Sequence, residues 1–220
     1  MRSRPKILRN ASRALATVAC GALALLAVQC SGTTTAPSPS PAAPAASTAT
    51  PAAPQPDPVA EAKAAWPTIY AVLQHPRCAN CHPAGNSPLQ GDDSHPHAQN
   101  VQRGPDGQGA AAMRCDTCHQ TSNLDGPHLP PGAPNWHLPK PEMPLVFVGK
   151  SSEELCKQLR DPKQNGGRTP EQLFEHMASD PLVLWGWSPG PGREPVSTPH
   201  EELVKALKAW IAGGCGCPGE

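Results

Sequence analysis

Two short stretches of this 220-residue chain, Cys78-Ala-Asn-Cys81-His82 and Cys115-Asp-Thr-Cys118-His119, repeat one pattern. In each, two cysteines are separated by two residues, and a histidine follows the second cysteine directly. This spacing lets both thiols bond to one flat ligand while the imidazole is held beneath it. The chain therefore carries two sites of the same expected chemistry, and the rest of the sequence is interpreted from them.

The repeated pattern, C-x-x-C-H, is the attachment sequence for c-type haem. The thiols add across the two vinyl groups of a porphyrin, and the histidine becomes the proximal iron ligand. On these two motifs, the segment from about 75 to 150 resembles a dihaem member of the c-type cytochromes. The resemblance implies two haem c groups, attached through Cys78 and Cys81 and through Cys115 and Cys118. His82 and His119 are then the proximal ligands.

Two other interpretations of the cysteines remain open. Two C-x-x-C pairs could supply the four thiolates of a structural zinc site. Alternatively, each pair could form a disulfide, as in thiol redox proteins. Neither interpretation requires a histidine directly after the second cysteine, and both motifs have one.

The composition favours a protein that needs help to fill its core. The chain has 30 prolines and 19 glycines but only 4% aromatic residues. Few large apolar side chains are available to exclude water, and two porphyrins would supply the missing apolar surface. Turn-forming residues dominate 83–114 and 120–150, so we expect long irregular loops there.

Residues 1–29 are typical of a signal peptide, with a basic start followed by an apolar run from 14 to 28. That run is shorter than the about 20 residues of a membrane-spanning helix. Cys30 follows it, and the arrangement resembles a bacterial lipoprotein signal, which implies lipidation at Cys30. Gln29 departs from that signal, because a small residue is usual there. Simple secretion and an uncleaved anchor remain alternatives. We expect a periplasmic or extracytoplasmic protein, lipid-anchored to a bacterial membrane.

Residues 30–57 are almost entirely Ala, Pro, Ser and Thr and are predicted to be a disordered linker. The dihaem domain is expected at 58–217. Five of the 18 basic residues and none of the 18 acidic ones lie in 1–29, so the remaining chain has 13 basic residues against 18 acidic ones. A mildly acidic surface without a basic stripe argues against binding nucleic acid.

We expect a mainly α fold with long irregular loops. A helix should begin at Asp57-Pro58 and end by His75-Pro76, with Pro67 kinking or dividing it. An entry helix before the first motif is also similar to the start of small cytochromes c. Three later helices are predicted from capping sequences that begin at Ser151, Thr169 and Thr198. The apolar run from Pro181 to Trp187 is predicted to be a strand or an extended segment.

The second axial ligand of each iron is left open by the motifs. The candidates are His75, His95, His97, His128, His137, His176, His200, Met113 and Met143. Met143 lies in a proline-rich segment that resembles the methionine loop of monohaem cytochromes c, and His97 lies between the two motifs. We predict one His/Met iron and one bis-histidine iron from these two residues. His176 and His200 are interpreted as ordinary polar residues on helices.

Three cysteines remain after the motifs and Cys30 are set aside: Cys156, Cys215 and Cys217, apart from Cys20 in the leader. One disulfide among the three is predicted in an oxidising compartment, tying the helix from Ser151 to the C-terminus. A metal site at Cys215-Gly-Cys217 is a weaker alternative.

The expected function is electron transfer between redox partner proteins. The segment Cys156-Lys-Gln-Leu-Arg160-Asp-Pro and the run Trp185-Gly-Trp187 also resemble small proteins described as isoquinoline 1-oxidoreductase subunits. That resemblance implies a molybdenum hydroxylase as electron donor. One alternative is a peroxidase-type haem enzyme with one open iron site. Another is a zinc-binding structural module.

Overall fold

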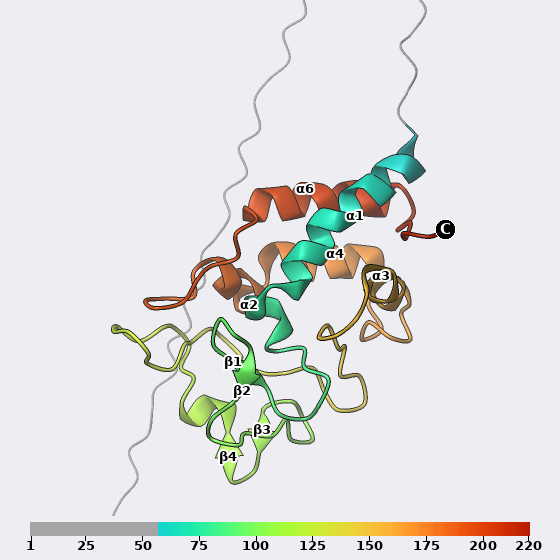
Figure 1. The fold of residues 1–220 in the computed structure, drawn as a ribbon. Helices are drawn as coiled ribbons and strands as arrows, with labels where there is room; N and C mark the ends of the chain where they lie inside the picture. The colour runs from blue at the N-terminus through green and yellow to red at the C-terminus, as the bar shows by residue number, and fades with distance from the viewer. Residues whose placement is uncertain (1–56) are drawn as a thin grey trace, which may run out of the picture. The chain divides into compact units, whose positions relative to one another are not determined.

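The computed structural model describes residues 57–220. The predicted signal peptide, the lipidation site at Cys30 and the linker up to residue 56 lie outside the described residues. Within 57–220 the chain is mainly helical with long irregular loops, as expected, and it also contains two short hairpins that were not predicted (Figure 1). No helix in this range combines the length and the apolar character needed to cross a membrane.

The first helix, α1, spans Pro58–Gln74 and begins as predicted. The Asp57 carboxylate accepts a hydrogen bond from Val59 N at 3.0 Å, and Pro58 takes the first helical position. Pro67 does not divide the helix, so that alternative was wrong. Pro67 is exposed, and water can replace the hydrogen bond that its missing amide would have made. The buried face continues on both sides of it, through Ala62, Trp66, Ile69, Val72 and Leu73.

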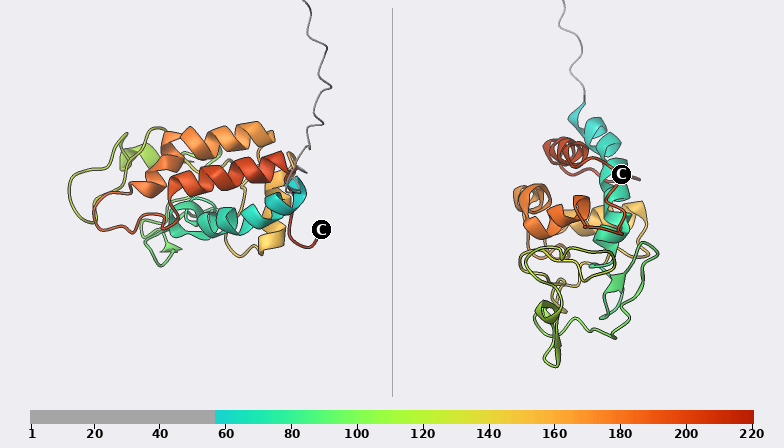
Figure 2. Two further views of the ribbon diagram at one scale, coloured as in Figure 1. Left: turned by 90° about the horizontal axis from the view of Figure 1, so that it is seen from above. Right: turned by 90° about the vertical axis from the view of Figure 1, so that its left-hand side faces the viewer.

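The last helix, α6 (His200–Ala212), packs against α1 and closes the core. Trp66 of α1 and Trp210 of α6 are almost fully buried, and their ring centroids lie 5.4 Å apart. Seen from above, α6 runs between α1 and α4 (Pro170–Ser179), and it contacts both helices (Figure 2). The apolar packing of α1 against α6 thus holds together the first and last helices of the described chain.

Two of the three predicted capping boxes are present. Helix α3 spans Ser152–Arg160, with both reciprocal bonds between Ser151 and Glu154 formed. Helix α4 begins with the same pair of bonds between Thr169 and Gln172.

The third predicted cap, at Thr198, was wrong. Helix α6 begins at His200, its N-cap is Pro199, and no side chain caps it. The carbonyl of Thr198 instead accepts a hydrogen bond from Trp187 Nε1 at 2.8 Å. Because Thr198 lies one position too early, its hydroxyl cannot reach the first free amides of the helix.

The run from Pro181 to Trp187 is helical rather than extended, which corrects the prediction. It forms α5 (Pro181–Leu184) and the 3₁₀-helix η2 (Trp185–Trp187). The Asp180 carboxylate caps α5 by accepting from Leu182 N at 2.9 Å, and Pro181 takes its first position. Cap and proline together start a helix that the apolar composition alone did not indicate.

The predicted disulfide is present between Cys156 and Cys217. It joins α3 to the segment that follows α6, and Cys215 is a buried free cysteine. A metal site at Cys215 and Cys217 is therefore wrong, since Cys217 is in the disulfide.

The segment from 83 to 150, called here the loop part, contains little regular structure. Strands β1 (Leu89–Gln90) and β2 (His95–Pro96) form one antiparallel hairpin, and β3 (Gly109–Ala110) and β4 (Met113–Arg114) form another. Buried Arg103 donates to the carbonyls of Gly85 and Pro139, which ties distant stretches of the loop part together. The loop part lies on one side of the helices, below them in Figure 1, and the helices form the helical part (57–82 and 151–217) (Figures 1 and 2).

Candidate functional site

The first C-x-x-C-H motif lies where α1 ends and the loop part begins. After Gln74 the chain turns at His75, whose ring accepts from Arg77 N, and enters the short helix α2 (Pro76–Ala79). Cys78 lies on α2, and Cys81 and His82 follow it. Removal from water raises the pKa of Cys78 to about 12 and that of Cys81 to about 11. Both are free thiols, and both are neutral at physiological pH.

The ring of His82 is fixed by the loop part. Its Nδ1 lies 2.8 Å from the carbonyl oxygen of Leu145, and its ring stacks on Phe147 with centroids 3.8 Å apart. The backbone repeats the contact, since Phe147 N donates to His82 O at 2.9 Å. Burial lowers the pKa of His82 to about 3, so the ring is neutral. Because a carbonyl can only accept, Nδ1 carries the proton and Nε2 keeps a free lone pair.

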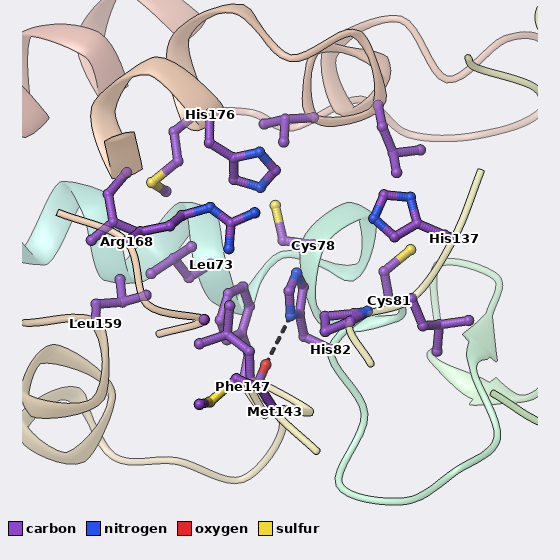
Figure 3. A pocket seen from close by; sticks show the side chains of 18 of the residues that line it. Leu73, Cys78, Cys81, His82, His137, Met143, Phe147, Leu159, Arg168 and His176 are labelled. Atoms are coloured by element: carbon purple, nitrogen blue, oxygen red, sulfur yellow. Dashed lines mark hydrogen bonds between the residues drawn. The ribbon is translucent and has the colours of Figure 1, made fainter. Parts of the chain in front are cut away.

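His82 and its two cysteines line a cavity of about 570 Å³ between the helical part and the segment from 135 to 147 (Figure 3). This volume is within the range of about 300–1,000 Å³ for small-molecule and cofactor sites. Most of the wall is apolar, including Val72, Leu73, Leu138, Phe147, Leu159, Leu173, Leu182 and Val183. Arg168 lies in the same wall, and in Figure 3 its guanidinium extends toward the space above His82.

The second motif lies in the loop part, directly after the β3–β4 hairpin. Cys115 opens the 3₁₀-helix η1 (Cys115–Thr117) and is buried, whereas Cys118 is exposed. Gly109 in the hairpin has a φ of +92°, and an added Cβ would lie 2.5 Å from Met113 O. Only glycine fits this close turn, which sets the position of Cys115.

His119 is held in the same way as His82. Its Nδ1 lies 2.8 Å from the carbonyl oxygen of Pro131, and its ring stacks on Trp136 with centroids 4.4 Å apart and planes 3° apart. Burial lowers the pKa of His119, so this ring is also neutral. The proton is again on Nδ1, and Nε2 is again left with a free lone pair.

His97, a predicted axial ligand, lies beside His119. The two ring centroids are 6.3 Å apart. Two imidazoles that bind one metal from opposite sides have centroids about 6 Å apart, from metal–nitrogen bonds of about 2 Å and the ring dimensions. His97 Nδ1 is buried and has no hydrogen-bond partner in the described part of the chain. The structure therefore brings together His97 and the second motif, as a shared metal ligand pair would require.

Met143, the other predicted axial ligand, lines the cavity of the first motif. It lies two residues before Leu145, the residue that holds His82 Nδ1. In Figure 3 it lies on the Leu145 side of His82. His137, His176 and Met177 line the same cavity.

The remaining candidates lie elsewhere. His75 caps α2, and His95 Nδ1 pairs with Asp93 at 2.6 Å. His200 Nε2 bonds to Met177 O at 3.0 Å. Met113 is exposed on β4, and His128 is exposed in the loop part.

The two motifs are neighbours in the fold. Burial is the main cause of the raised pKa of Cys81, and the nearby Cys115 thiol adds to it. Trp136 stacks on His119 and also contacts Trp185 in an edge-on arrangement, with the two ring centroids 5.0 Å apart. Trp185 in turn lines the cavity of the first motif. Asn123 Oδ1 accepts from both Trp185 Nε1 and Gly132 N, which joins the loop around His119 to η2. An aromatic contact thus runs from one site to the other.

No protein-family model matches this chain, and no curated protein or solved structure is significantly similar to it. The assignment of the sites therefore depends on the geometry of the chain's own residues.

The residues of both motifs fit a covalently held haem. Each motif presents two free thiols and an imidazole whose Nε2 is unprotonated, and the first faces an apolar cavity of suitable volume. The disulfide interpretation finds no support, because all four motif cysteines are free. For zinc, three or more His, Cys, Asp or Glu side chains would have to converge, and no such group is present in 57–220.

Sequence reasoning missed the groups that orient the two histidines. Leu145 and Pro131 act through backbone carbonyls, which every residue has, so no side-chain pattern marks them. It also set aside His176, which pairs with Asp180 at 3.0 Å. The spacing of four residues on a predicted helix could have indicated that pair.

Proposed function

We propose that this protein is a dihaem c-type cytochrome that transfers electrons between redox partners outside the cytoplasm. The observation that carries the proposal is the repeated construction of the two motifs. In both, the histidine donates Nδ1–H to a loop carbonyl at 2.8 Å and stacks on an aromatic ring. Metal-binding histidines almost always donate their second nitrogen in this way, since the bond fixes the ring and raises its basicity.

In this proposal each residue of the motifs has a stated role. Cys78, Cys81, Cys115 and Cys118 form the thioether bonds. His82 and His119 would bind iron through Nε2, and His97 would be the second protein ligand at the second motif. Phe147 and Trp136 prevent the two imidazoles from rotating. Bound haem would supply a reversible one-electron couple, tuned by axial ligands and burial.

Transfer between the sites is supported by their proximity. The Cys115 thiol is close enough to Cys81 to add to the raised pKa of Cys81, and Trp136 contacts Trp185 between the two sites. A carrier needs such closely spaced centres but needs no substrate pocket. Its partners would be redox proteins, among them the molybdenum hydroxylase that the resemblance implies. The predicted lipid anchor at Cys30 would keep the carrier near a membrane.

A pyridine haemochrome assay on protein expressed in a compartment that attaches c-type haem tests the proposal. We expect two haems per chain in the wild type. Cys115→Ala/Cys118→Ala should reduce the count to one, and Cys215→Ala, a matched change at a free cysteine outside the motifs, should leave it at two. A wild-type protein without haem, but with one zinc ion per chain, would establish the zinc module instead.

Carbon monoxide binding to the reduced protein separates a carrier from a peroxidase-type enzyme. We expect no spectral change, because both irons of a carrier have two protein ligands. Stoichiometric binding at one haem would contradict the carrier and favour the enzyme.

A further inference from the structure

We propose that His176, and not Met143, is the second axial ligand of the iron held at the first motif. The inference rests on the proposed function, because it requires a haem at Cys78 and Cys81. It replaces the prediction of one His/Met iron and one bis-histidine iron by two bis-histidine irons.

His176 has the geometry of an oriented ligand. It lies on α4 and lines the cavity that also contains His82. Its Nδ1 lies 3.0 Å from Asp180 Oδ2, and a carboxylate at this distance accepts the Nδ1 proton. The lone pair is thereby left on Nε2. In metal sites, a carboxylate commonly accepts the proton on the second ring nitrogen of a ligating histidine.

Asp180 is itself held in place, so the orientation of His176 is determined by the fold. Its other oxygen, Oδ1, accepts from Leu182 N at 2.9 Å and caps α5. Its backbone amide donates to His176 O at 3.3 Å. The backbone amide of Asp180 thus closes the end of α4, while its carboxylate caps α5 and fixes the imidazole, which makes the arrangement rigid before any ligand binds.

The cavity places His176 opposite His82. Figure 3 shows His82 rising from the motif, with its bond to Leu145 on the lower side, and His176 entering from α4 above it. The free Nε2 of His82 is on the side away from Leu145, which is the side of His176. A planar group held by Cys78 and Cys81 would lie between the two rings.

Met143 lies on the wrong side for this role. The segment that carries it also supplies the Leu145 carbonyl to His82 Nδ1, the nitrogen that faces away from the iron. Its backbone is held in a turn by the bond from Met143 N to Lys140 O at 3.0 Å. Reaching the far face would require this segment to release His82.

Two further side chains in the cavity are weaker candidates. His137 bonds through Nδ1 to Asn135 O, two residues away in a loop, and lies beside Cys81 in Figure 3. That position is at the edge where a thioether forms. Met177 is buried in the apolar core, with its side chain 7% exposed.

Bis-histidine ligation has a consequence for the chemistry. Methionine ligation raises the potential of a haem relative to histidine ligation, so two bis-histidine haems would work at lower potential than the mixed pair. Both irons would be closed to external ligands, which is the property of a carrier.

Near-infrared magnetic circular dichroism of the oxidised full-length protein tests the inference, because it distinguishes bis-imidazole from imidazole–thioether ligation. We expect two bis-imidazole signals and no thioether signal in the wild type. His176→Met should convert one of the two haems to thioether ligation, and Met143→Leu should change neither. A thioether signal that disappears in Met143→Leu would overturn the inference.

Carbon monoxide binding supplies a second measurement. The reduced His176→Ala protein should bind one carbon monoxide per chain, whereas wild type, Met143→Leu and His137→Gln should bind none. If His176→Ala retains two haems and its reduced form binds no carbon monoxide, the inference is overturned.

Asp180→Asn keeps the histidine and the cap of α5, because asparagine is also a good N-cap. It weakens the bond behind His176, so it should raise the potential of one haem and leave the other unchanged. An unchanged pair of potentials would count against His176. Absence of haem in the wild type would instead contradict the proposed function itself, so the two failures are distinguishable.

Discussion

The first and second motifs hold their histidines with the same contacts, but they lie in different surroundings. His82 follows the short helix α2 and faces a cavity lined mainly by apolar side chains. His119 follows the β3–β4 hairpin and η1 in the loop part, and its neighbour Cys118 is exposed. One backbone carbonyl and one aromatic ring are thus sufficient to orient the imidazole of each motif histidine, both beside the cavity and in the loop part. The surroundings then decide how far each centre is removed from water.

This difference suggests a division of work between the two centres. A more exposed second centre would be the one that partners reach, because electron transfer requires close approach. A more buried first centre would have a potential set mainly by its apolar wall. The contrast can be tested by changing equivalent residues at both motifs.

The largest effect is expected from removing the cysteine pairs. Cys78→Ala/Cys81→Ala leaves the first cavity unfilled, and an empty space of that size costs more than about 5 kcal/mol. Total stabilities are about 5–15 kcal/mol, so this variant should lose its cooperative unfolding transition. Cys115→Ala/Cys118→Ala should keep one haem and the helical signal. Thermal unfolding followed by far-ultraviolet circular dichroism makes the comparison, and equal midpoints would contradict it.

A smaller loss of stability is expected from removing the disulfide between Cys156 and Cys217. Cys156→Ala/Cys217→Ala opens a link across 61 residues, which should destabilise the protein by about 4 kcal/mol. The melting temperature should fall by about 10 °C. The loss of stability should be confined to the helical part, and the protein should still bind two haems per chain. Cys215→Ala, a change of the buried free cysteine nearby, is the control, and an equal loss there would show that the disulfide itself contributes nothing.

The smallest loss of stability is expected from replacing the aromatic rings that stack on His82 and His119. Each ring pair contributes about 0.5–1.5 kcal/mol beyond its burial. Phe147→Leu should destabilise the protein more than Trp136→Leu, because Phe147 is 4% exposed, whereas Trp136 is only partly buried. Each change should shift the midpoint potential of its own haem alone, measured by spectroelectrochemistry. A larger loss of stability in Trp136→Leu would reverse the assignment of the buried centre.

Local features of the fold were predictable where one short segment contains all the interacting groups. The start of α1 needs only Asp57 and Pro58, and the cap of α3 needs only Ser151 and Glu154. Prediction failed at Thr198, although its capping sequence is equally local. The carbonyl of Thr198 bonds to Trp187, and the helix begins one residue later than its capping sequence indicates.

The same distinction applies to the candidate sites. Cys78, Cys81 and His82, and their counterparts in the second motif, were identifiable because each C-x-x-C-H pattern lies within five adjacent positions. The partner across each site was not, because it comes from another part of the chain. His97 was predicted as a ligand, but only the fold assigns it to His119. His176 was set aside, since a histidine on a helix has no local sign of what it faces.

By itself, the sequence determined the two motifs and the starts of α1, α3 and α4, and the scarcity of aromatic residues led to the prediction of an added apolar group. Only the tertiary structure decided which carbonyls orient His82 and His119, which side chains face them, and which motif is buried. The physical reason is range. Attachment and capping act between neighbours in the chain, whereas burial and the second face of each site depend on packing between segments far apart in sequence.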